Sequence, residues 1–208
     1  MGSRRWVGIA VFGLGAALAG CEAAEDEGAL VGPDRDFGTA LEIGAAQWSR
    51  VGGIEAAEGP TRWVELPATG SGGYRGVVTG WAGGGVPVDY VADLALDVDF
   101  DRREVSGSAG NFVTNGVSGF RHPEGKIPLS GVVARDGRGE ARIVIDGSGL
   151  LRGPGIEADY AIDGAGGFVG DRAQGLRGDH ATDFRWTQGH LEGTVSRSDG
   201  VFSAVADE

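Results

Sequence analysis

The sequence predicts an all-β fold, a single antiparallel up-and-down β-barrel of about eight strands. Glycine makes up 41 of the 208 residues without a Gly-X-Y repeat, and few glycine-free windows are long enough for a helix. Apolar and polar residues alternate with period two through most of the chain after residue 73. Short turn motifs separate the alternating stretches. Closure into a barrel is favoured over an open sandwich, because Lys126 is the only lysine that could protect an exposed strand edge.

The expected strands follow one another with short connections. The clearest is 90–100, where Leu96 is predicted to be buried and Asp97 exposed on the opposite face. The others are 74–81, 104–112, 126–134, 140–146, 156–162, 176–184, 190–196 and 201–205. Tight turns are expected at 101–102, 136–137 and 199–200. The glycine-rich stretch 164–178 is expected to form a corner or the barrel closure, with Phe168 as an apolar plug.

The first twenty residues have the features of a removable export signal. Arg4 and Arg5 form a charged start, followed by an apolar segment and small residues up to Gly20. Cys21 comes directly after and is the only cysteine, so it cannot form an internal disulfide. The Leu-Ala-Gly-Cys run at 18–21 resembles a bacterial lipoprotein signal, which implies a lipid on Cys21 and a membrane anchor. The alternative is an ordinary secretory signal with a chance cysteine.

Three regions follow from this interpretation. Residues 1–20 are the signal peptide, residues 21–60 the lipidated N-terminus, and residues 61–208 the barrel domain. The acidic stretch 22–32 is typical of a flexible tether. In 34–59 apolar residues recur at roughly helical spacing between glycines, so we expect a short helix or an irregular cap packed on the barrel.

The charge of the chain limits its partners. The net charge is −12, and removal of the signal arginines makes it more negative. Phosphates of nucleic acid and anionic lipid headgroups would both be repelled, so neither is an expected partner. The charge fits a soluble domain that only a lipid holds to the membrane.

Three stretches carry a family resemblance. They are Leu-Pro-Ala-Thr-Gly at 66–70 with Gly-Tyr-Arg-Gly at 73–76, the alternating run 92–100 with Val-Ser-Gly-Ser at 105–108, and the glycine-rich block 166–178 with Gly-Val-Phe at 200–202. Together they resemble the transferrin-binding protein B-like β-barrel lipoprotein family, as a single-barrel member. The resemblance implies a lipid-anchored protein of the bacterial outer membrane, often displayed on the cell surface, that binds a host protein or haem. A surface-lipoprotein translocator and a TonB-type receptor are further expected partners. The chain has no separate handle domain ahead of the barrel, so transferrin itself is not the expected ligand.

Catalysis and metal binding have no support in the residues. There is no Gly-x-Ser-x-Gly motif, and acylation of Cys21 would remove the only thiol. His122, His180 and His190 share no metal-ligand spacing. We therefore expect a protein that is not an enzyme, with no metal and no cofactor. Haem ligated by one histidine is the alternative that the resemblance leaves open.

Partner binding is assigned to loops, because bulky inward residues are expected to fill the barrel lumen. The candidate residues lie in the loop 113–125 and around a late turn, and they are Phe120, Arg121, His122, Trp186 and His190. The alternative is that both aromatic residues fold back as lids on the barrel ends. Two other functions stay open at this point: a lipocalin-like carrier of a small apolar ligand, and a structural envelope lipoprotein.

Overall fold

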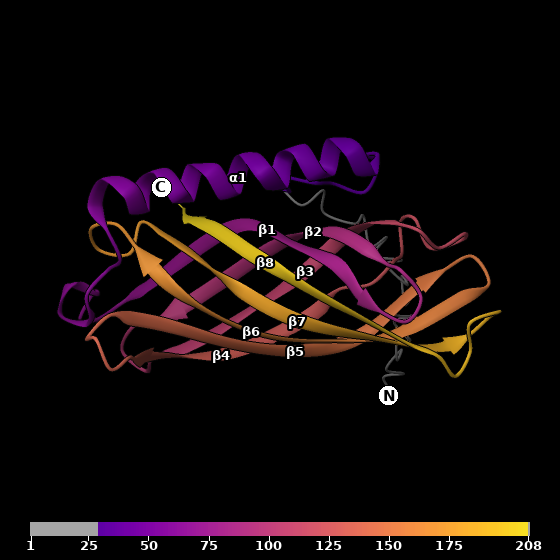
Figure 1. The fold of residues 1–208 in the computed structure, drawn as a ribbon. Coiled ribbons are helices and arrows are strands. Elements are labelled where there is room, and N and C mark those ends of the chain that lie inside the picture. Colours follow the sequence, from indigo (N-terminus) through magenta and orange to yellow (C-terminus); the bar gives the residue numbers. More distant parts are fainter. Residues whose placement is uncertain (1–28, 208) are drawn as a thin grey trace, which may run out of the picture.

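The computed structural model describes residues 29–207. They form a closed barrel of eight strands, in which each strand pairs antiparallel with the next and β8 pairs with β1 (Figure 1). The predicted up-and-down β-barrel is thus confirmed. The signal peptide and Cys21 lie outside the described residues, so lipidation stays a prediction. The helices of residues 29–207 lack the length of uninterrupted apolar sequence that a bilayer crossing requires.

A long helix and a short 3-10 helix precede the barrel. The elements are α1 (Phe37–Glu58), η1 (Trp63–Glu65), β1 (Ser71–Gly84), β2 (Asp89–Asp99), β3 (Glu104–Asn115), β4 (Ile127–Arg135), β5 (Ala141–Gly153), β6 (Ile156–Val169), β7 (Gly175–Gln188) and β8 (Val195–Ala206). The β1–β2, β3–β4, β5–β6 and β7–β8 connections lie at one end of the barrel, and the other connections lie at the opposite end (Figure 1).

Alternation along the strands fills the lumen. Leu96 is fully buried and Asp97 is exposed, as predicted. The largest buried side chains come from six strands and the β3–β4 loop, and they are Tyr74, Tyr90, Phe112, Phe120, Tyr160, Phe168, Phe184, Trp186 and Phe202. Their polar atoms have partners inside the barrel, since the Tyr90 and Tyr160 hydroxyls lie 2.9 Å apart. An eight-stranded barrel has room for side chains or for one small ligand, and here side chains take that room.

The predicted turn at 199–200 is wrong. Both residues lie within β8, which is one continuous strand where two had been expected. Gly200 faces inward, and a side chain there would clash with the carbonyl oxygen of Thr79 and with the ring of His180. A glycine is required at position 200 because the neighbouring strand and side chain leave no room for a Cβ atom, and not because the chain turns there. The turns at 101–102 and 136–137 are confirmed, the second by the Asp136 carboxylate accepting from the backbone N–H of Arg138.

The glycine-rich stretch 164–178 contains a turn, as the expected corner required, but most of it is strand. The other expectation, that it closes the barrel, is wrong, because closure is made by the pairing of β1 with β8. Residues 164–169 complete β6, residues 170–174 make the turn, and β7 begins at Gly175. Phe168 is fully buried, which confirms it as an apolar plug.

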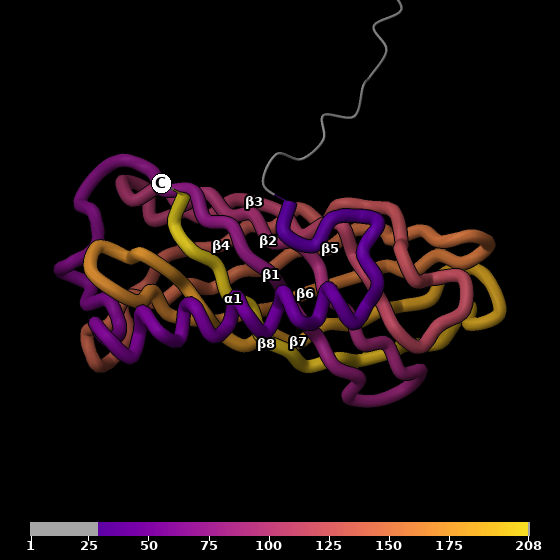
Figure 2. The backbone as a smooth tube through the Cα atoms, turned by 90° about the horizontal axis from the view of Figure 1, so that it is seen from above, coloured from indigo at the N-terminus to yellow at the C-terminus, as the bar shows by residue number. Residues whose placement is uncertain are grey.

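Helix α1 lies along the outside of the barrel, above β1, β2 and β8 (Figures 1 and 2). The helical option for this segment is confirmed, but the helix has 22 residues and is not short. Asp36 caps its N-terminus by accepting from the backbone N–H of Thr39 at 3.0 Å. Gly44 faces the barrel, where a Cβ atom would lie 2.9 Å from Thr79 Cγ2. Gly44 lowers the intrinsic helix propensity of the segment, but it lets the helix pack closely on the barrel. This packing outweighs the loss of propensity.

The chain just before α1 is fixed to the barrel. The Asp93 carboxylate on β2 accepts from the backbone N–H groups of Leu30 and Val31, both at 2.8 Å. Val31 is fully buried. The end of the stretch 22–32, predicted to be flexible tether, is thus part of the folded domain.

Candidate functional site

The two aromatic residues predicted to contact a partner lie in the core. Phe120 is fully buried and Trp186 is 1% exposed, with their rings 4.9 Å apart. The β3–β4 loop folds back over the barrel end, because the Thr114 N–H donates to the carbonyl oxygen of Arg121 at 2.8 Å. Trp186 points inward from β7 and donates to Ser196 Oγ at 2.9 Å. Their placement on an exposed loop and turn is therefore wrong, and the alternative of inward-folded lids describes the structure.

The other three predicted partner-binding residues are exposed. Arg121 and His122 lie in the β3–β4 loop and His190 in the β7–β8 loop, at the same end of the barrel. Within residues 29–207, no hydrogen bond or ion pair joins these three side chains, so they share a barrel end without forming a built site.

His180, a candidate haem ligand, is 5% exposed and lies beside Tyr90 in the lumen. Its Nε2 donates to the carbonyl oxygen of Thr79 at 2.9 Å, and burial lowers the pKa of the imidazole below its ordinary value of 6.5. The part of the chain that the structure describes contains no group of three metal-ligating side chains.

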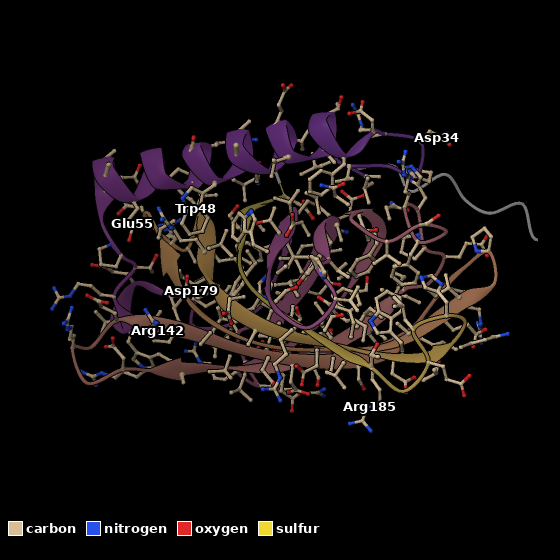
Figure 3. The ribbon with its side chains drawn as sticks, turned by 45° about the vertical axis from the view of Figure 1, so that its right-hand side comes forward. Asp34, Trp48, Glu55, Arg142, Asp179 and Arg185 are labelled. Atoms are coloured by element: carbon tan, nitrogen blue, oxygen red, sulfur yellow. The ribbon has the colours of Figure 1, made fainter. Side chains whose placement is uncertain are left out.

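A hollow on the surface lies between α1 and the outer faces of β5, β6 and β7. We call it the helix–barrel groove; its volume is about 440 Å³. Figure 3 shows Trp48 and Glu55 on the underside of α1, with Arg142 and Asp179 below them on the barrel. Gly167 and Arg177 also line it. The groove therefore combines a tryptophan, arginines and carboxylates from distant parts of the chain.

Strand register creates a notch in the floor of the groove. Gly167 on β6 pairs with Arg142 on β5 and with Arg177 on β7, so the three residues form one row. Neighbouring strands lie about 4.8 Å apart, which places the two arginine backbones about 10 Å from each other with a glycine between them. Arg142 Nη1 lies 3.4 Å from the point where a Cβ of Gly167 would be. The Arg142 guanidinium therefore lies beside the part of the groove floor formed by Gly167, where no side chain is present.

Arg177 is held in place by the helix. Its Nη1 donates to Glu55 Oε2 at 3.0 Å, and its guanidinium carbon lies 3.7 Å from the centre of the Trp48 ring. The Arg177 side chain is 25% exposed. One arginine of the notch is therefore preorganised by a carboxylate and an aromatic face. Arg142 forms no ion pair within residues 29–207.

The outer face of the sheet also carries an acidic row. Asp146 on β5 pairs directly with Asp163 on β6, and Asp163 is followed in the same row by Ala181 on β7 and Asp199 on β8. All three carboxylates are exposed. Like charges directly opposite each other destabilise a sheet, so the Asp146–Asp163 pair is an unfavourable contact at neutral pH.

Sequence reasoning did not identify Trp48, Arg142 or Arg177 as site residues. The adjacent glycines 166 and 167 were a visible signal, but only the strand register shows that arginines flank one of them. Guanidinium N–H groups are the charged hydrogen-bond donors that the groove offers, and its lining residues include no nucleophile paired with a base. No known family model matches the chain, and no curated protein matches it in sequence.

Proposed function

We propose that this chain is a lipid-anchored binding protein of the bacterial outer membrane, a single-barrel relative of the transferrin-binding protein B-like lipoproteins. In this proposal the barrel is a rigid scaffold, Cys21 carries the lipid, and the outer surface recognises a protein partner. The closed eight-stranded antiparallel barrel is compatible with that family.

The main support for recognition on the outer surface is that side chains fill the barrel lumen. Tyr90, Phe112, Tyr160 and Phe184 pack against one another in its centre, three of the pairs edge to face and the Tyr90–Phe112 pair tilted, with ring centres 5.0–5.9 Å apart. A small apolar ligand would have to displace these rings and break the Tyr90–Tyr160 hydrogen bond. A carrier function is therefore disfavoured, and we expect a partner to bind on the outside of the barrel.

A protein partner fits the surface better than haem. Haem needs an apolar slot and an accessible ligand, whereas His180 is enclosed and engaged with Thr79. In the acidic row, the carboxylates of Asp146 and Asp163 lie directly opposite each other, and a partner with a basic surface would relieve their repulsion. The partner we expect is accordingly a protein that presents a basic face.

Site-specific photo-cross-linking on cells tests this function. The photoreactive residue replaces His122 at the loop end, Arg138 at the groove rim, or Val132, which is 51% exposed on β4. We expect at least one position to capture a protein, and an excess of the purified unlabelled domain should compete that capture away. In parallel, native mass spectrometry of the purified domain should show the mass of the polypeptide alone. A bound small apolar molecule, together with no competed cross-link, would contradict the proposal and favour a carrier.

A further inference from the structure

We infer that the Arg142–Gly167–Arg177 notch is a binding site for a carboxylate group. The inference goes beyond the proposed function, since the notch would bind its ligand whether or not a protein partner is found. Three properties of the notch lead to it: the available donors, the open floor and the local charge.

The donors are guanidinium N–H groups on both sides of the notch. Each guanidinium has five N–H bonds in a planar fork that matches two carboxylate oxygens. Arg177 uses Nη1 for Glu55 and one face for Trp48, which leaves further N–H bonds at its edge. Arg142 forms no ion pair in residues 29–207, and its charge acts on the Asp136 carboxylate only at longer range, so its N–H bonds remain open to a ligand.

The floor of the notch leaves room for the ligand between the donors. Gly167 has no side chain, and the nearest atoms to a Cβ built there are Arg142 Nη1 at 3.4 Å and the carbonyl oxygen of Ala141 at 3.7 Å. A ligand oxygen above Gly167 would therefore meet guanidinium donors and no blocking side chain. The groove volume of about 440 Å³ lies in the range of small-ligand sites.

The local charge favours a singly charged oxyanion over a doubly charged one. Arg138, Arg142 and Arg177 line the groove together with Glu55, Glu140 and Asp179, so the charges balance. A carboxylate brings one negative charge into the groove, whereas a phosphate dianion brings two, close to three carboxylates in a protein of net charge −12. The carboxylate can belong to a free small acid or to an acidic side chain of a protein, and the chemistry of binding is the same.

NMR titration of the folded domain tests the inference. The probes are sodium acetate, a capped Gly-Asp-Gly peptide and inorganic phosphate, each added at constant ionic strength against sodium chloride. The reporters are the backbone amides of Gly166 and Gly167 and the indole N–H of Trp48. We expect saturable shifts with acetate, with the peptide, or with both. Acetate binding as tight as peptide binding identifies a small acid as the ligand class, and binding of the peptide alone identifies a protein side chain.

Matched variants assign the binding to the notch. Arg142→Gln should raise the Kd at least about tenfold, which corresponds to one hydrogen bond with a charged group. Arg185→Gln should leave the Kd unchanged, because Arg185 is exposed on β7 away from the groove (Figure 3). Gly167→Ala adds a methyl group at ordinary contact distance from Arg142, so the fold is retained while the floor is filled, and binding should weaken. Equal Kd values in all three variants, tighter binding of phosphate than of carboxylate, or no saturable shift would each overturn the inference.

Discussion

Arg177 on β7 stacks on Trp48 of α1, with the guanidinium carbon 3.7 Å from the ring centre. The same guanidinium pairs with Glu55, about two turns further along the helix, at 3.0 Å. One barrel arginine thus fixes the C-terminal half of α1 at two points. The helix forms one wall of the helix–barrel groove, so this contact also sets the shape of the groove.

Loss of the Trp48 ring should therefore loosen the helix without unfolding the barrel. We expect Trp48→Leu to lower the free energy of unfolding by about 1 kcal/mol, the size of a partly shielded cation–π contact. Amide hydrogen exchange should quicken in α1 more than in β1–β8. Trp81→Leu is the matched control, because Trp81 is 47% exposed on β1. Equal exchange rates in the two variants would show that the Trp48–Arg177 contact does not hold the helix.

The burial of Phe120 and Trp186 leads to a second prediction, on stability. Each aromatic-to-alanine change should cost about 3–5 kcal/mol, as for other core aromatic residues. His122→Ala in the same loop should stay within about 0.5 kcal/mol, because its side chain is exposed. Chemical denaturation of the three variants gives these values. A small effect of Phe120→Ala would mean that the loop packs more loosely than the structure indicates.

These residues show where sequence patterns fail. The strand 90–100 was predictable because one of its faces is entirely apolar and the other carries Asp93, Asp97 and Asp99. The pattern did not show that Val91 on the acidic face is also buried. Phe120 was misassigned because a loop has no periodicity to indicate which way it folds. Asp199-Gly200 looks like a turn, and only the barrel closure shows that Thr79 and His180 occupy the space beside that glycine.

The candidate site was less predictable than the fold. Arg142 and Arg177 are far apart in the sequence and are brought together by pairing of β5 and β7 with β6. Trp48 joins them only because α1 packs on that side of the barrel. Each of these steps depends on tertiary packing, for which a single sequence carries no local signal.

The buried His180 predicts a pH-dependent stability. Burial lowers its pKa in the folded state below 6.5, while the backbone contact to Thr79 and the neighbouring Asp179 and Asp199 carboxylates oppose that shift more weakly. The unfolded chain then binds the proton more readily, so stability should be highest above pH 6.5 and fall as the pH decreases below it. We expect the melting temperature of the wild-type domain to decrease below pH 6.5, and His180→Gln to reduce this slope.

His122→Gln provides the control for this pH dependence. His122 is exposed in the β3–β4 loop, so its replacement should leave the slope of the wild type intact. Tyr90, the other titratable group that packs on the His180 ring, stays protonated in this range because burial raises its pKa. An unchanged slope in His180→Gln would assign the acid sensitivity to carboxylates instead.

The proposed function depends most directly on the lipid at Cys21. Mass spectrometry of the mature N-terminus measures whether residue 21 is acylated. Fractionation of wild-type and Cys21→Ser cells measures whether the protein is held in the membrane. We predict an acylated residue 21 in the outer-membrane fraction of the wild type, and an unacylated Cys21→Ser protein in the soluble fraction. A wild-type N-terminus without acyl chains, or equal membrane association of the two proteins, would contradict a lipid-anchored binding protein.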